Sequence, residues 1–213
     1  MPRVRVHQHV NPLSPFYRQP PAMLDRRTVF ADPELPLHLD IGSARGRFLM
    51  RMATVQPGWN YLGVEIRQPL VDEANRLAGE AGLGNLHYAF CNAMLWLDRL
   101  LENIPNGMLQ MVTIQFPDPW FKKKHAKRRM VNDELVDTVA KHLTPGGKVF
   151  VQTDIEPLFD KIVGLFTASQ RFSIHQISEN PFPIRTERET AVEANDLAVH
   201  RSAFTRLAYT ALL

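Results

Sequence analysis

The segment Leu37-His38-Leu39-Asp40-Ile41-Gly42-Ser43-Ala44-Arg45-Gly46 decides how this chain folds. Its apolar first half predicts a short buried strand over residues 37–41, and its glycines predict a tight turn into a helix. The apolar face of that helix runs from Phe48 to Ala53, and Pro57-Gly58 ends it. A second strand is predicted at residues 61–65, so the segment opens a β-α-β unit.

The alternation of strand and helix signals continues along the chain. Further strands are predicted at residues 86–90, 111–116 and 148–153, and helices at residues 69–78, 94–101, 135–143 and 157–166. Residues 172–177 and 203–212 are interpreted as two closing strands with no helix between them, which fits an antiparallel hairpin at one sheet edge. We therefore predict an α/β fold with a doubly wound, mostly parallel sheet of seven strands, whose last strand pair is antiparallel.

Composition limits the class of protein. The chain has 213 residues, 45% of them hydrophobic and 22% charged, which is the size and composition of one soluble domain. No run of about 18 apolar residues is present, so we expect no membrane span. The single cysteine, Cys91, excludes an internal disulfide and fits a reducing, cytoplasmic setting. Residues 1–36 are rich in proline, so we expect an N-terminal arm before one domain at residues 37–213.

Polar side chains follow the predicted strands. Asp40, Glu65, Asn92, Asp118 and Asp154 each lie at or just after the end of a strand. Ligands of doubly wound sheets bind beyond the carboxyl ends of the strands. We therefore expect these side chains to line a single binding site.

The turn after the first strand distinguishes between two classes of cofactor. Residues 42–46 read Gly-Ser-Ala-Arg-Gly, whereas a dinucleotide fingerprint has the pattern Gly-x-Gly-x-x-Gly. A carboxylate at Asp40 would repel a pyrophosphate and would attract an ammonium or sulfonium group. Glu65 suits both hydroxyls of a ribose, and Asn92 suits either an adenine edge or a helix cap. The pattern favours S-adenosylmethionine over NAD.

Residues 116–129, Phe-Pro-Asp-Pro-Trp-Phe-Lys-Lys-Lys-His-Ala-Lys-Arg-Arg, are the most informative segment for function. Two prolines restrict Phe116 and Asp118 to extended conformations, so the Asp118 carboxylate stands on a stiff turn. Trp120 and Phe121 offer faces for stacking on a base, with burial in the core as the alternative. The cations that follow suit a polyanion, unless they form only a solvated face. They are Lys122, Lys123, Lys124, Lys127, Arg128 and Arg129. The combination indicates an enzyme that acts on a base of a nucleic acid.

At this segment the sequence resembles a known family, the tRNA (guanine-N7)-methyltransferases of the bacterial TrmB type. The resemblance runs from residue 37 to residue 189 and is most specific at residues 116–129. The other family motifs follow in order, and they are Asp40-Ile41-Gly42, Gly63-Val64-Glu65, Asn92-Ala93, Thr153-Asp154 and Thr186-x-x-Glu189. Two positions depart from the family pattern. Ala44 replaces a frequent glycine, and Arg188 stands where many members have an aromatic residue.

The resemblance implies a Rossmann-like class I methyltransferase that uses S-adenosylmethionine and methylates N7 of guanosine 46 in the variable loop of tRNA. It implies cofactor contacts from Asp40, Gly42, Glu65, Asn92 and Asp118. It also implies a catalytic role for Asp118, and contacts with the substrate nucleoside from Lys122, Asp154, Thr186 and Glu189. The cationic run is expected to bind tRNA, no metal is expected, and monomer and homodimer both stay open.

The chemistry of guanine defines the expected role of Asp118. N7 carries a lone pair and no proton, so the reacting atom requires no general base. We expect Asp118 to orient guanine through its N1/N2 edge or to stabilise the developing positive charge. Three alternatives stay open: a methyltransferase for another RNA or a small aromatic compound, an RNA-binding module with a degenerate cofactor pocket, and an NAD oxidoreductase.

Overall fold

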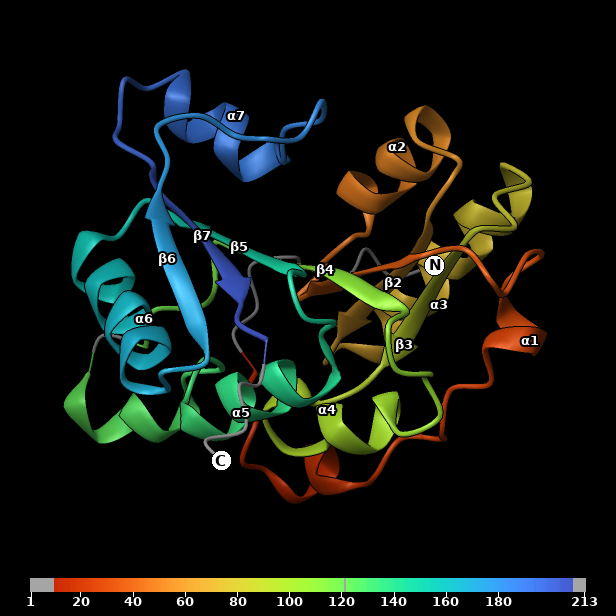
Figure 1. Cartoon of the computed structure of the whole chain (residues 1–213), viewed down its shortest axis with the longest axis horizontal. Helices are drawn as coiled ribbons and strands as arrows, with labels where there is room; N and C mark the ends of the chain where they lie inside the picture. The colour runs from red at the N-terminus through yellow and green to blue at the C-terminus, as the bar shows by residue number, and fades with distance from the viewer. Residues whose placement is uncertain (1–9, 121, 209–213) are drawn as a thin grey trace.

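The computed structural model describes residues 10–120 and 122–208, apart from the side chains at positions 123 and 126. Within these residues, seven strands form one sheet in the order β3-β2-β1-β4-β5-β7-β6 (Figure 1). The strands are β1 Leu37–Ile41, β2 Asn60–Glu65, β3 Leu86–Phe90, β4 Leu109–Gln115, β5 Lys148–Thr153, β6 Phe172–Gln176 and β7 His200–Arg206. Strands β1 to β5 are parallel, and β7 is antiparallel to β5 and to β6. The predicted fold class is confirmed.

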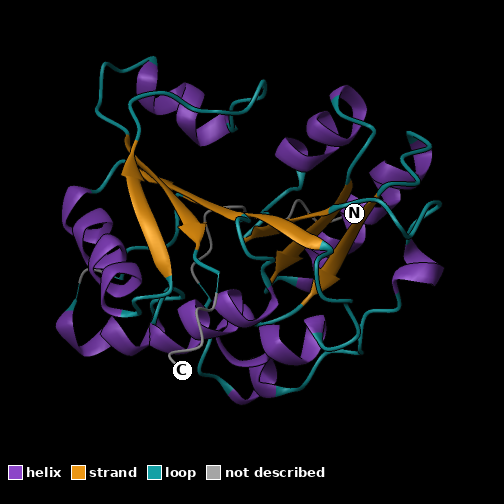
Figure 2. Cartoon of the chain, viewed as in Figure 1, coloured by secondary structure: helices purple, strands orange, loops and turns teal. Residues whose placement is uncertain are grey.

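Helices cover both faces of the sheet, as Figure 2 shows. Helices α2 Arg47–Val55 and α3 Gln68–Glu80 pack on one face. Helices α4 Ala93–Leu101, α5 Asp133–His142 and α6 Glu156–Ala168 pack on the other. Because both faces are covered, β1 and β2 are buried along their whole length, as central parallel strands usually are. No helix in the described part of the chain is long and apolar enough to cross a membrane.

The register of the central strands builds the floor of a site. Asp40, the fourth residue of β1, lies opposite Gly63 of β2 on one side and Thr113 of β4 on the other. Parallel strands end at the same edge, so the loops after β1, β2, β3, β4 and β5 converge there. The site described below lies at that edge.

The connection between β6 and β7 corrects one prediction. It contains helix α7 Glu187–Glu193, where no helix was expected. A capping box forms this helix: the Thr186 hydroxyl accepts from the Glu189 backbone N–H, and the Glu189 carboxylate accepts from the Thr186 N–H. Only Glu189 and Val192 are buried, so the segment shows no apolar stripe from which a helix could be predicted. Strand β7 begins at His200, three residues earlier than expected, and residues 209–212 of the predicted strand lie outside the described residues.

The N-terminal arm packs against the domain. It contains a short 3-10 helix, η1 Pro15–Arg18, and one turn of helix, α1 Arg26–Val29. The side chains of Leu24 and Phe30 are buried in the same hydrophobic core as β1 and β4. The arm therefore packs against the domain within residues 10–36, whereas residues 1–9 lie outside the described part.

Candidate active site

A cleft of about 1520 Å³ opens at the carboxyl edge of the sheet. All of the polar side chains predicted at strand ends line it, and they are Asp40, Glu65, Asn92, Asp118 and Asp154. Gly42 and Thr186 line the same cleft, whereas Lys122 and Glu189 do not. The structure thus brings together most of the predicted site residues, from the loops after β1 to β5 and from the start of α7.

Asp40 is a buried carboxylate with few partners. Its Oδ1 accepts a hydrogen bond of 2.6 Å from the Thr113 hydroxyl and a long one of 3.4 Å from the Gln115 amide. Burial raises the pKa of Asp40 to about 6, and the negative charge of Glu65 adds to the rise, while the two hydrogen bonds oppose it. A carboxylate in this setting gains free energy when a cation binds beside it.

His38 lies behind Asp40 and was not predicted to belong to the site. Burial lowers its pKa to about 3, so the ring is neutral, and its Nε2 lies 3.1 Å from the Thr113 hydroxyl. Since that hydroxyl donates to Asp40, it accepts from His38, and Nε2 therefore carries the ring proton. The ring stacks on Phe182 at 5.4 Å between centroids. In the sequence, the one feature that could have pointed to His38 is its position between two leucines of a predicted buried strand.

Glu65 is held by four donors. Its carboxylate accepts from the backbone N–H groups of Ala44 and Arg67 at 2.9 and 3.0 Å, and from the Arg67 guanidinium at 2.8 and 2.9 Å. Burial would lower the pKa of Arg67, but the hydrogen bonds to Glu65 and the charges of Glu65 and Asp118 raise it above its ordinary value. Arg67 thus links the ends of β2 and β4 electrostatically.

The glycines of the turn serve two different purposes. Gly42 has a φ of +87°, a left-handed conformation that favours glycine, and it lines the cleft, where an added Cβ would contact the Met130 Cε at 3.9 Å. A Cβ on Gly46 would lie 2.5 Å from the Tyr88 ring, and one on Gly63 would lie 2.3 Å from it. These two glycines therefore make room for Tyr88. Ala44 has a φ of +49°, a left-handed conformation that favours the family's glycine.

Asn92 attaches the N-terminal arm to the cleft. Its Nδ2 donates to the carbonyl oxygens of Pro12 and Tyr17 at 2.9 and 3.2 Å. Asn92 is the N-cap of α4 by position, but its side chain makes no capping hydrogen bond, so the capping alternative is wrong. Pro12 itself lines the cleft, so the N-terminal arm forms part of the cleft wall, whereas the sequence predicted site residues only within residues 37–213.

The turn that carries Asp118 has an unexpected shape. Phe116, which was expected to be extended, has a φ of +50°, and Trp120 has a φ of +42°. The Phe116 N–H still bonds the Gln152 carbonyl at 2.8 Å, so the chain stays in the sheet ladder and must turn sharply after it. The Arg129 side chain donates to the Pro119 carbonyl at 3.0 Å, and the Arg128 guanidinium lies 5.0 Å from the Trp120 ring centroid. Two of the predicted RNA-binding cations thus hold the turn in place.

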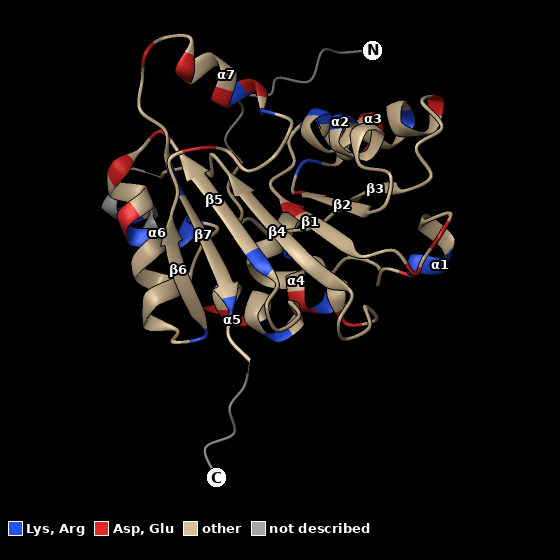
Figure 3. Ribbon diagram, turned by 45° about the horizontal axis from the view of Figure 1, so that its top comes forward, with Lys and Arg blue, Asp and Glu red and all other residues tan. Residues whose placement is uncertain are grey.

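The remaining cations of the run are on the surface. Lys122, Lys124 and Lys127 are exposed around the 3-10 helix η2 Lys123–Arg128. Phe121 and the side chain of Lys123 lie outside the described residues. Figure 3 shows that most other Lys, Arg, Asp and Glu residues also lie on helices and loops and leave the sheet largely uncharged.

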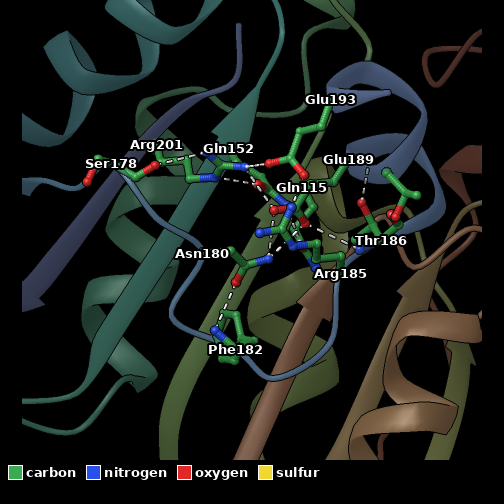
Figure 4. A network of polar contacts seen from close by, with 11 residues as sticks. Gln115, Gln152, Ser178, Asn180, Phe182, Arg185, Thr186, Glu189, Glu193 and Arg201 are labelled. Carbon is green, nitrogen blue, oxygen red and sulfur yellow. Dashed lines mark hydrogen bonds and ion pairs between the residues drawn. The ribbon is translucent and has the colours of Figure 1, made fainter. Parts of the chain in front are cut away.

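The start of α7 forms the far side of the cleft. Arg188 makes an ion pair with Asp154, and Glu187 makes one with Arg47 of α2. The carboxylate predicted to contact the substrate, Asp154, is thus joined to the residue that replaces the family's aromatic. Glu189 points the other way, into a buried polar network between α7 and the sheet (Figure 4).

Comparison with known proteins identifies relatives across almost the whole chain. A family model described as "Putative methyltransferase" matches residues 34–202. The tRNA (guanine-N(7)-)-methyltransferase of Trichormus variabilis is 51% identical over 211 residues, which cover 97% of this chain and 98% of that protein. The protein of the same name from Synechococcus elongatus is 53% identical over 209 residues, with the same coverage of 97% and 98%.

Solved structures of lower identity share the fold. The aminoglycoside resistance methyltransferase NpmB1 aligns with a TM-score of 0.54 at 16% identity, over 85% of this chain and 90% of that one. An rRNA methylase from Streptococcus thermophilus aligns with a TM-score of 0.53 at 10% identity, over 86% and 92%. At this identity the likeness concerns the fold alone.

Proposed function

Because this chain belongs to the tRNA (guanine-N7)-methyltransferase family, we propose that it transfers a methyl group from S-adenosylmethionine to N7 of guanosine 46 in the variable loop of tRNA. The observation that carries the proposal is the convergence of Asp40, Glu65 and Asp118 on one cleft, in a chain half identical to enzymes named for this reaction. The enzyme consists of one methyltransferase domain at residues 37–213 with an arm at residues 1–36, and it works in the cytoplasm.

The cleft fits this cofactor. When bound, S-adenosylmethionine supplies an electrophilic methyl group on a positively charged sulfur. Asp40 would hold the cationic end, because its buried carboxylate has a raised pKa and is stabilised by a neighbouring positive charge. Gly42 lines the cleft and has no side chain, so a ligand can approach its backbone closely. Asn92 contributes through the arm that it attaches to the cleft wall.

Glu65 would bind the ribose, and Arg67 controls access to it. A carboxylate offers about four lone-pair sites, and four donors already occupy those of Glu65. Ribose hydroxyls can therefore reach Glu65 only where the Arg67 guanidinium gives up side-chain hydrogen bonds. The guanidinium then stays within the field of Asp118, whose charge already raises its pKa.

Asp118 acts on the guanine. Its carboxylate accepts hydrogen bonds from the N1 and N2 donors of the base and turns N7 toward the methyl group. It also faces the positive charge that the base acquires. Opposite unit charges about 4 Å apart interact by about 4 kcal/mol at an effective dielectric constant of 20, which bounds the rate effect at about a thousandfold. No proton leaves N7, so the methyl transfer requires no proton uptake by Asp118.

The wall of the cleft that faces the substrate contains the Arg188–Asp154 ion pair, which can open when substrate binds. Asp154 binds the nucleoside when it exchanges Arg188 for donors of the base or ribose. Thr186 lines the same wall, and Lys122 reaches a neighbouring phosphate from the surface. Together with Lys123, Lys124, Lys127, Arg128 and Arg129, Lys122 forms the tRNA-binding run.

Incubation of the purified protein with tritiated S-adenosylmethionine and unmodified tRNA, followed by digestion to nucleosides, tests the activity. We expect the label in N7-methylguanosine. Label in another nucleoside, or none in tRNA, contradicts the proposal and favours another RNA, a small aromatic substrate or a binding module. Asp118→Ala should fold normally and lose activity by about a hundredfold or more. Near-normal turnover of that variant would refute the role of Asp118.

A further inference from the structure

Glu189 was expected to contact the substrate nucleoside, yet its carboxylate is fully occupied within the protein. Its Oε1 accepts from Arg201 Nη2 at 2.9 Å and from Asn180 Nδ2 at 3.0 Å. Its Oε2 accepts from Asn180 at 2.7 Å, from Gln152 Nε2 at 3.1 Å and from the Thr186 N–H at 3.3 Å. The side chain is 0% exposed, and no lone pair is left for RNA.

The partners of Glu189 anchor it to the sheet (Figure 4). Arg201 comes from β7, is 9% exposed and also bonds Glu193 of α7 at 2.7 Å and the Ser178 carbonyl at 3.0 Å. Gln152 comes from β5, is 0% exposed, and accepts from Arg201 Nε at 3.2 Å through its own carbonyl. These bonds cross-link α7 to two neighbouring strands.

The same network reaches the cofactor side. Gln152 Nε2 donates at 2.8 Å to Gln115, whose amide lines the cleft and lies 3.4 Å from Asp40. On the opposite side of Glu189, Thr186 and Arg188 line the cleft, and Arg188 pairs with Asp154. The position of α7 therefore sets the geometry of the wall that faces the substrate.

We propose that Glu189 and Arg201 form a buried brace, locked by Gln152 and Asn180, that fixes the first turn of α7 over the substrate side of the cleft. Glu189 is then a positioning residue and does not touch the RNA. The roles of Thr186 and Asp154 toward the substrate depend on this brace. The inference rests on the proposed function for the identity of the substrate, and on the network alone for the brace itself.

A double-mutant cycle separates a brace from a direct contact. The variants are Glu189→Gln, Arg201→Met and the pair. If the two residues act as one brace, each single variant raises KM for tRNA about tenfold, and the pair is no worse than the worse single variant. The affinity for S-adenosylhomocysteine changes less than about twofold, because the cofactor carboxylates are untouched. Additive losses of about a hundredfold in the pair would overturn the proposal.

A milder variant keeps the test valid if removal of a buried charge prevents folding. Asn180→Ala removes the bonds to Glu189 without touching the cleft lining, and it should raise KM for tRNA about threefold with kcat unchanged. Asn195→Ala is the matched control, because Asn195 follows α7 and is exposed, and its side chain bonds only the Ala191 carbonyl in the described structure. Equal KM values for the two variants would contradict the brace.

Hydrogen exchange distinguishes failure of the brace from failure of the proposed function. In Asn180→Ala without RNA, the amides of α7 should exchange about tenfold faster, while those of β1 stay unchanged. Unchanged α7 exchange overturns the brace, whatever the enzyme methylates. A wild-type protein that does not methylate tRNA overturns the proposed function, and the exchange result still decides the brace.

Discussion

Thr113→Val should shift the pH dependence of cofactor binding. The Thr113 hydroxyl donates to Asp40 at 2.6 Å in a buried setting, and this hydrogen bond lowers the Asp40 pKa against the effect of burial. Valine has nearly the same shape and removes the donor. Loss of the bond destabilises the ionised carboxylate and leaves its neutral form almost unaffected, so the Asp40 pKa rises from about 6.

The size of the shift follows from the strength of the bond. A hydrogen bond to a charged group contributes about 1.5–3 kcal/mol, and 1.36 kcal/mol corresponds to one pKa unit. The pKa of Asp40 should therefore rise by about one to two units, to between about 7 and 8. Affinity for the cationic cofactor is lost as pH falls through this value, because protonated Asp40 carries no charge. At pH 7 we expect a loss of roughly twofold to tenfold, which disappears near pH 9.

Isothermal titration of S-adenosylmethionine between pH 5.5 and pH 9 measures the shift. Thr113→Ser keeps the hydroxyl and serves as the control, with a profile like that of the wild type. Valine also leaves His38 Nε2 without its partner, so we expect a loss of about 1–3 kcal/mol of folding stability, measured by urea unfolding. Superimposable pH profiles for valine and wild type would refute the assignment of Asp40 as the cation-binding carboxylate.

Other variants test separate parts of the account. Ala44→Gly should raise the free energy of unfolding by up to about 1 kcal/mol, because glycine adopts the φ of +49° without strain, and a lower melting temperature would contradict this. Joint replacement of Lys122, Lys124 and Lys127 by alanine should weaken tRNA binding more at low salt than at high salt, and should reduce the slope of log K against log salt by about 0.9 for each phosphate that the variant no longer neutralises. An unchanged slope would make these lysines a solvated face. Asn92→Ala should release residues 10–18 to proteolysis and weaken cofactor binding, whereas equal proteolysis of variant and wild type would show that other contacts hold the arm. In the protein without cofactor, Asp40 should increase the free energy of unfolding as pH falls from about 6 toward 3.8, because its carboxyl binds a proton more tightly in the folded state than in the unfolded state. Asp40→Asn should remove this increase, and an unchanged pH profile of stability in that variant would contradict the assignment.

Much of the fold was predictable because local signals and burial agree. Residues 37–41, 86–90 and 148–153 form the strands expected, since short, largely apolar runs between turn residues suit the strands of a sheet that helices cover on both faces. The convergence of Asp40, Glu65 and Asp118 followed from the rule that parallel strands end at one edge. These predictions depend on features that lie close together in the sequence.

The rest depends on contacts between distant segments. Helix α7 has no apolar period. The capping box at Thr186 and Glu189 is a local signal for its start, but its attachment to the sheet depends on the Glu189–Arg201 pair, twelve residues apart. Asn92 contacts the carbonyl of Pro12, eighty residues away, which no local pattern indicates. Phe116 is left-handed although proline follows it, and its N–H still bonds the Gln152 carbonyl, 36 residues further along the chain, so the local proline rule failed at this position. The donors around Glu65 likewise include the Ala44 N–H, 21 residues away in the sequence.

Chemical mapping of N7-methylguanosine tests the central claim most directly. An unmodified full-length tRNA transcript is incubated with the wild-type enzyme and S-adenosylmethionine, reduced with borohydride and cleaved with aniline at N7-methylated guanosines. We expect a single new cleavage at guanosine 46, absent when Asp118→Ala replaces the wild type. Cleavage at a different guanosine, or methylated tRNA that resists aniline, would contradict it.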